Sequence, residues 1–219
     1  MVPPVDFIPI AEETGLILGL GSWVLEAGCR TPVIWQGDPG MASLTLAVNV
    51  SVRQFRHPGY VAEVRAVTQL HGIDPRRLKL ERTESLLVDD MEATIEKLMK
   101  LKARGIGFLL DDFCTGYPAL SYRKRLPLDQ LKIDRSFVRD IMTDQNDAAI
   151  ARTIIALGSS LGLDVIAEVV ETEEQQDFLS RNGCGRFQGY RFSRPLPLCE
   201  FETCVLQSRQ TDLALRAAG

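Results

Sequence analysis

The chain has 219 residues, of which 45% are hydrophobic and 25% are charged, and its formal net charge is −4. This composition is typical of a soluble globular protein, and the length is sufficient for one domain with a sizeable core. General nucleic-acid binders carry a basic excess, so we expect no DNA partner. We expect no membrane span in this segment either, because no apolar run reaches the roughly 18 residues that a spanning helix requires.

Short apolar runs alternate with longer amphipathic ones along the chain. Residues 6–29 predict one or two helices, and residues 31–43 predict a long loop. Six strands are then predicted at 44–50, 78–82, 106–112, 130–134, 163–169 and 186–190. They are rich in Val, Ile, Leu and Phe, and most do not alternate with polar residues, which is typical of parallel strands covered on both faces.

Helices are predicted between and after the strands, at 58–72, 89–105, 144–162, 172–183 and 198–209. Residues 89–105 illustrate the boundary chemistry, because acidic residues come first, basic residues come last and Gly105 ends the segment. Residues 210–219 are expected to extend the last helix or to form a frayed tail. Strands that alternate with helices in this way favour a parallel α/β fold.

The five cysteines form no CxxC pair, and their number is odd. This usage predicts free thiols in a reducing compartment, which favours a cytoplasmic location.

Each predicted strand carries a polar side chain at its C-terminal end. In chain order these residues are Asn49, Glu81, Asp111 with Asp112, Lys132 with Asp134, Glu168 and Gln188. Taken singly, such a residue is usually solvated in a loop, but a repeat over six apolar strands is not expected by chance. In a β/α barrel, the C-terminal ends of the strands meet on one face, where the loops build the active site.

The adjacent acids Asp111 and Asp112 indicate which kind of ligand the strand ends could bind. Neighbouring carboxylates repel each other and are costly to bury unpaired, so either they face water or a positive charge lies between them. Clustered carboxylate and amide oxygens suit hard cations such as Mg²⁺ or Mn²⁺. No His or Cys occupies these strand ends, which argues against a zinc site.

Several segments resemble the motifs of the EAL domain family, the bacterial cyclic di-GMP phosphodiesterases. They include "FIPIAEETGLI" at 7–17, "VNVSVRQF" at 48–55, "LERTES" at 80–85, "DDFCTGYPAL" at 111–120, "LKIDRSFV" at 131–138, "AEVVET" at 167–172 and "QGYRFSRPLP" at 188–197. The resemblance implies a TIM-like (β/α) barrel and a single domain over 1–219. The match covers about 7–202, and 203–219 would form a C-terminal helix or tail.

The resemblance also implies roles for the polar residues at the strand ends. The metal ligands would be Asn49, Glu81, Asp111 and Glu168, with Asp112 on a second ion of the Mg²⁺ or Mn²⁺ pair. Lys132, Glu168 and Gln188 would form the catalytic group, in which Lys132 positions or activates the attacking water and Gln188 supports it. Glu84 and Asp134 would steady the loop 113–120. The ligand would be cyclic di-GMP, and hydrolysis would give linear pGpG.

The sequence departs from the family at identifiable positions. The Glu-Ala-Leu motif is not in the chain, and six strands are counted where a barrel has eight, so we expect an N-terminally truncated barrel. The family usually has Gly where Cys114 and Val169 stand, two serines where Pro118 and Ala119 stand, and an aliphatic residue where Arg82 stands. Without the motif's glutamate and its following arginine, we expect weak turnover or none from the chain as given.

Two functions therefore compete. The first is an EAL-type phosphodiesterase that uses divalent metal ions. The alternative is a non-hydrolysing cyclic di-GMP receptor or a protein-interaction scaffold, and formation of pGpG discriminates between them. The resemblance further implies a homodimer or larger oligomer and an upstream sensory or GGDEF domain.

Overall fold

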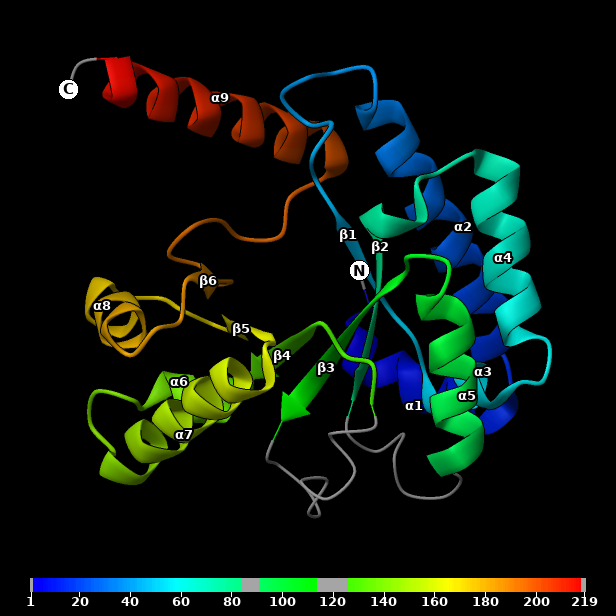
Figure 1. Ribbon diagram of the computed structural model, residues 1–219, viewed down its shortest axis with the longest axis horizontal. Helices are drawn as coiled ribbons and strands as arrows, with labels where there is room; N and C mark the ends of the chain where they lie inside the picture. Colours follow the sequence, from blue (N-terminus) through cyan, green and yellow to red (C-terminus); the bar gives the residue numbers. More distant parts are fainter. Residues whose placement is uncertain (1, 84–90, 114–125, 218–219) are drawn as a thin grey trace.

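The computed structural model describes residues 2–83, 91–113 and 126–217, without the side chains of 112–113 and 210–217. Its centre is a parallel sheet in which every strand pairs with its neighbours in sequence, in the order β1-β2-β3-β4-β5-β6. The strands are β1 (Leu46–Asn49), β2 (Leu78–Thr83), β3 (Gly107–Phe113), β4 (Gln130–Ile133), β5 (Asp164–Ala167) and β6 (Arg186–Phe187). The sheet curls into a half-barrel with helices on its outside, which confirms the predicted TIM-like architecture (Figure 1).

Helices connect successive strands and flank the sheet. They are α1 (Pro4–Thr14), α2 (Ile17–Trp35), α3 (Val52–Arg56), α4 (Tyr60–His71), α5 (Met91–Lys102), α6 (Arg135–Arg139), α7 (Gln145–Leu161), α8 (Glu173–Arg181) and α9 (Leu198–Ala217). In Figure 1, α2, α4 and α5 lie toward the right of the sheet, while α6, α7 and α8 lie toward the left. Among the described residues, no helix combines the length and the apolar character needed to cross a bilayer.

The six strands and the long helices were all predicted from the sequence. The helix α7 shows why this worked, because Asp144 caps its first turn by accepting from the backbone of Asn146 and Asp147. Its last turn ends at Gly162, whose φ of 69° is easily reached by glycine alone. The short helices α3 and α6 were not predicted, since five residues are too few to show a helical period.

The prediction of a loop over 31–43 was wrong at its start, because α2 continues through Pro32 to Trp35. A proline inside a helix removes one backbone hydrogen bond. Here tertiary packing overrides that cost, since both Pro32 and Trp35 are buried. Arg77 holds the following segment by donating to the carbonyl oxygens of Met41 and Leu44, each at 3.0 Å.

Alternate residues of the strands face the helices and build two hydrophobic cores. Val48, Leu80 and Phe108 belong to the first core, which packs under α2, α4 and α5. Leu131 and Ala167 belong to the second core, which packs under α6, α7 and α8. The remaining strand residues face the concave side of the sheet, as the two-residue period of a strand requires.

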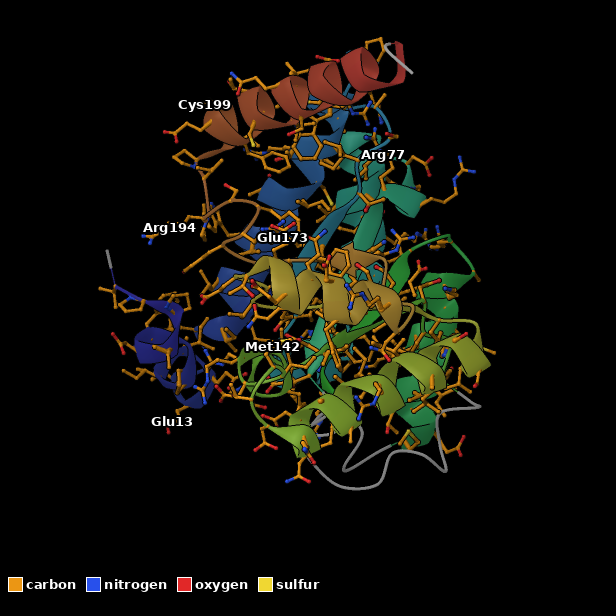
Figure 2. All side chains as sticks on the ribbon, turned by 90° about the vertical axis from the view of Figure 1, so that its left-hand side faces the viewer. Glu13, Arg77, Met142, Glu173, Arg194 and Cys199 are labelled. Carbon is orange, nitrogen blue, oxygen red and sulfur yellow. The ribbon has the colours of Figure 1, made fainter. Side chains whose placement is uncertain are left out.

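Helix α9 crosses the molecule at the end where α2 finishes. The Trp35 indole Nε1 donates to Glu202 Oε1 at 2.8 Å, and the Trp35 and Phe201 rings lie 5.8 Å apart. Figure 2 shows Cys199 near the start of α9 and Glu13 on α1 toward opposite ends of the view. Residues 210–219 were expected to extend this helix or to form a frayed tail, and α9 continues to Ala217.

Candidate metal and catalytic site

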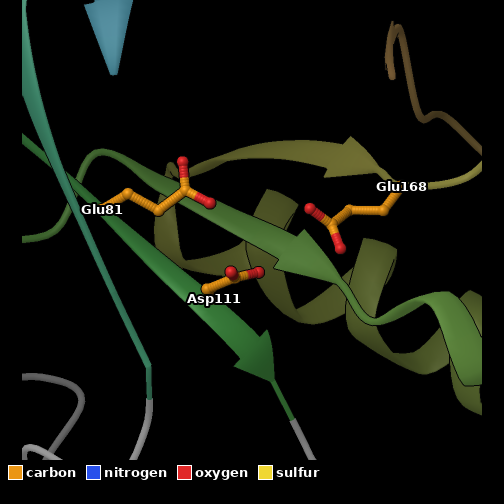
Figure 3. Close-up of side chains that lie close together, drawn as sticks. All are labelled: Glu81, Asp111 and Glu168. Atoms are coloured by element: carbon orange, nitrogen blue, oxygen red, sulfur yellow. The ribbon is translucent and has the colours of Figure 1, made fainter. Parts of the chain in front are cut away.

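Strand register brings polar side chains together at the C-terminal ends of the central strands. Glu81 lies on β2, Asp111 near the end of β3, and Lys132 on β4, while Glu168 follows β5 by one residue. All four lie on the concave side, because the two-residue period of each strand directs them away from the cores. Figure 3 shows Glu81, Asp111 and Glu168 pointing toward a common point.

The three carboxylates form a compact cluster. One oxygen from each of Glu81, Asp111 and Glu168 lies within 4.8 Å of the others. The ammonium of Lys132 donates to Glu81 Oε1, forms an ion pair with Glu168 Oε1, and lies 3.6 Å from Asp111 Oδ1. Lys132 therefore offsets part of the repulsion among the three carboxylates, and the cluster keeps an excess of acidic groups over basic ones.

Burial sets the electrostatics of this cluster. The side chains of Lys132 and Glu81 are 6% and 9% exposed. Burial raises the pKa of Glu81 and of Glu168, and the Lys132 ammonium only partly offsets this effect. For Lys132, burial opposes the charged form, but the hydrogen bonds to Glu168 and Glu81 outweigh it and raise the pKa. Lys132 is therefore an ammonium ion at neutral pH and a hydrogen-bond donor.

Two sequence-predicted residues lie at the margin of the cluster. Asn49 ends β1 directly beside Glu81 in the sheet register, and its side chain is exposed. Gln188 follows β6, where its backbone N–H donates to Ala167 O at 2.8 Å and its carbonyl accepts from Val170 N at 3.0 Å. Gln188 is also exposed. The structure thus brings four of the predicted residues together and leaves these two at the rim.

The remaining predicted residues differ in what the structure describes of them. Asp134 is buried and caps α6, where its Oδ1 accepts from the Ser136 backbone at 2.9 Å. The backbone of Asp112 lies in β3, but its side chain is outside the described part of the chain. Glu84 is also outside the described residues, as are the departures at Cys114, Pro118 and Ala119.

The segment after Glu168 has an unusual backbone. Val169 has a φ of 50°, the left-handed region that favours glycine and disfavours a β-branched side chain. Close by, a Cβ at Gly189 would lie 2.2 Å from Val170 O, so this position requires glycine. The valine at 169 therefore places backbone strain directly beside a carboxylate of the cluster.

Sequence reasoning missed two features of the concave side. The first is the pairing of Lys132 with Glu81 and Glu168, because the sequence indicated Lys132 as a residue of the site but not its partners. The second is a polar row at the opposite ends of the strands. There Lys79 Nζ donates to Gln130 Oε1 at 2.7 Å, and Arg186 pairs with Asp164 at 2.9 Å. The alternation of Lys79 and Glu81 with leucines in β2 could have revealed an inward polar face.

Comparison with known proteins gives consistent matches. The family model described as "EAL domain" matches residues 1–195. A bifunctional diguanylate cyclase/cyclic di-GMP phosphodiesterase, MucR of Pseudomonas aeruginosa, is 47% identical over 90% of this chain. This chain spans 29% of the length of MucR.

Solved structures agree with the sequence matches. The PaMucR phosphodiesterase in complex with c-di-GMP superposes with a TM-score of 0.87 at 46% identity, covering 91% of this chain and 81% of that one. A manganese/cy-diGMP complex of BlrP1 from Klebsiella pneumoniae gives a TM-score of 0.69 at 28% identity, covering 80% of this chain and 45% of that one.

Proposed function

This chain belongs to the EAL domain family, and from that premise we propose that it hydrolyses cyclic di-GMP to linear pGpG with a divalent metal ion. The main support is the convergence of three carboxylates and one ammonium at the C-terminal ends of adjacent strands. The solved structure of the related PaMucR phosphodiesterase contains c-di-GMP, which supports the same ligand here.

The donor set fits a hard divalent cation. Glu81, Asp111 and Glu168 would hold the ion, with Asn49 as a further ligand and Asp112 on a second ion. Carboxylate and amide oxygens suit Mg²⁺ or Mn²⁺, and the BlrP1 complex contains manganese. When bound, such an ion supplies positive charge that polarises a phosphate oxygen and offsets the repulsion among the carboxylates.

The chain's own side chains would position the reactants. Lys132 would donate a hydrogen bond to the attacking water or to a phosphate oxygen, and Glu168 would accept one from the water. Gln188, at the rim, would orient the same water through its amide. Asp134 would steady the loop that follows β3, together with Glu84.

The proposed reaction adds one water to the ring of cyclic di-GMP. The water oxygen forms a bond to phosphorus, the bond from phosphorus to the ribose O3′ breaks, and one proton of the water ends on the O3′. The product is linear pGpG with a terminal phosphate. Preorganised charge at the phosphate is the main source of acceleration in such a transfer.

Formation of pGpG by the purified chain in MnCl₂ or MgCl₂, followed by liquid chromatography, tests the proposal. We expect Glu168→Gln to reduce the rate by a factor on the order of 10²–10³, as for loss of one electrostatic group elsewhere. Asp164→Asn is the matched control, because Asp164 faces the same side of β5 at its other end and pairs with Arg186.

The receptor alternative has one specific observation in its favour, namely that the Lys132 ammonium already pairs with an oxygen of Glu81 and an oxygen of Glu168. If calorimetry detects binding of cyclic di-GMP and no pGpG is formed, the chain is a receptor and not a phosphodiesterase.

The wider context is also a proposal. We place residues 1–219 in one EAL-type domain of a bacterial cytoplasmic protein that forms a homodimer or larger oligomer. An upstream sensory or GGDEF domain would accompany it, in keeping with the bifunctional name of MucR.

A further inference from the structure

Two neighbouring residues of β2 point to opposite faces of the sheet. Glu81 faces the concave side and belongs to the carboxylate cluster, whereas Arg82 faces the helices and the first core. Arg82 is 4% exposed, and its guanidinium carbon lies 4.4 Å from the ring centroid of Phe55, a residue of that core. Arg82 is therefore a buried cation on the other face of the sheet from the cluster.

The hydrogen bonds of Arg82 are incomplete. Within the part of the chain that the structure describes, its Nε and Nη2 are buried without a hydrogen-bond partner. Its Nη1 donates to Ser51 O at 3.1 Å. Burying a charged group with unsatisfied donors is costly, and apolar residues in place of buried charged groups often leave stability unchanged or raise it. A side chain that lowers stability where it stands indicates a role other than stability.

The acceptor of this hydrogen bond lies just beyond Asn49. Asn49 is the last residue of β1 and pairs with Glu81 in the sheet register. The next residue is still bonded to β2, because Val50 N donates to Glu81 O at 3.0 Å. Beyond it the chain turns into α3, while β2 continues. The Arg82 side chain extends the connection between the two segments there, because it holds Ser51 O.

The turn that carries Asn49 is also held through α3. The Ser51 side chain caps this helix by accepting from Gln54 N at 3.1 Å. At the other end of the helix, Lys97 Nζ of α5 donates to Phe55 O at 2.9 Å. Both ends of α3 are thus fixed to neighbouring elements, and Ser51 transmits this order to the residues before it.

The Asn49 side chain depends on its backbone for its position. It is exposed, so packing does not hold the amide in place. Its distance from Glu81 is therefore set by the two segments of backbone that the Arg82 side chain connects. Residues that orient a metal ligand without touching the ion are known to tune metal affinity.

We propose that Arg82 is a positioning residue for the cation site, which by holding Ser51 O keeps Asn49 where it and Glu81 bind one divalent ion together. This inference rests on the proposed function, because it takes both residues as ligands of the same ion. Arg82 touches neither the ion nor cyclic di-GMP. Its unsatisfied donors lower the free energy of unfolding, and the preorganised strand ends are what this cost maintains.

Calorimetric titration of the purified chain with MnCl₂, together with urea unfolding without metal, tests this role. We expect Arg82→Met to bind Mn²⁺ about ten- to a hundredfold more weakly, the usual loss when a residue that orients a metal ligand is removed. Its urea midpoint should equal or exceed that of the wild type, because a buried charge with unsatisfied donors has been removed. Arg76→Met, which removes an exposed arginine paired with Asp74, should keep the wild-type affinity. Unchanged affinity or a lower midpoint for Arg82→Met would overturn the inference.

A double-mutant cycle then tests whether Arg82 acts through Asn49. Asn49→Ala alone should weaken Mn²⁺ binding, and adding Arg82→Met to it should cause no further loss, because the two residues act on one contact. Additive losses of affinity would show that Arg82 does not act through Asn49, and the inference would be wrong.

Glu81→Gln separates this inference from the proposed function. If this variant loses Mn²⁺ binding while Arg82→Met keeps the wild-type affinity, the cation site stands and the role of Arg82 alone is refuted. If the wild type binds no Mn²⁺, or if Glu81→Gln binds it as the wild type does, the proposed cation site and the role of Arg82 both fail.

Discussion

The ammonium of Lys132 on β4 and the carboxylate of Glu168 after β5 form a buried ion pair, and the same ammonium bonds Glu81 on β2. On the concave side of the sheet, Lys132 thus lies beside acidic side chains from three strands: Glu81 of β2, Asp111 of β3 and Glu168, which follows β5. Removing one partner of a buried pair is costly, because the remaining charges are left uncompensated.

We therefore expect Lys132→Met to lose about 3–5 kcal/mol of unfolding free energy at neutral pH without metal. Mn²⁺ should restore much of this loss, because a ligand that binds the folded state stabilises it by mass action. Urea unfolding with and without MnCl₂ measures both effects. Lys79→Met is the control, since Lys79 bonds Gln130 at the other end of the strands. Equal stabilisation of both variants by Mn²⁺ would contradict the expectation.

Val169→Gly is expected to stabilise the chain by about 1–2 kcal/mol. Val169 has a left-handed backbone conformation that strains a β-branched residue, and glycine adopts this conformation without strain. Thermal unfolding monitored by circular dichroism is the measurement. Val170→Gly, at a buried core position, should destabilise instead. A lower melting temperature for Val169→Gly than for the wild type would show that the strain is compensated by side-chain packing.

Gly189→Ala should act in the opposite direction. Its new Cβ would lie 2.2 Å from Val170 O, so the segment that follows Glu168 must move. The expected loss is about 1–3 kcal/mol, the usual cost of overpacking. Gly185→Ala is the matched control, because a Cβ there meets no atom within 4 Å. If the two alanine variants unfold at the same denaturant concentration, the close approach at Gly189 is not rigid.

The attachment of α9 can be tested through its contact with Trp35. Glu202→Ala removes the acceptor of the indole N–H and leaves a buried donor without a partner, at a cost of about 1–3 kcal/mol. We expect faster proteolytic cleavage within α9 while the remaining chain stays resistant. Glu200→Ala, on the same helix but exposed, should leave the cleavage rate unchanged. Equal rates for both variants would mean that the Phe201 contact alone holds the helix.

The sequence was sufficient to predict the strands, because each is a short apolar run bounded by turn residues. It was also sufficient to predict that the acidic side chains cluster, because parallel strands place their C-terminal ends on one face. It was not sufficient for the end of α2, where the burial of Pro32 and Trp35 outweighs the local preference of proline. It also did not reveal that Lys132 forms ion pairs with Glu81 and Glu168. That arrangement depends on the relative heights of β2, β4 and β5, which the register fixes only after the strands have paired.

The two hydrophobic cores divide the molecule into two parts. The first core lies with β1, β2 and the start of β3, the second lies with Leu110 of β3 and with β4 to β6, and Leu128 packs against both. Cores of this kind are natural cooperative units, so amide hydrogen exchange should divide the chain into two blocks of protection. Glu81 belongs to one block, whereas Lys132 and Glu168 belong to the other. A cation that joins these carboxylates would also fasten the blocks together, and its removal would let them open separately.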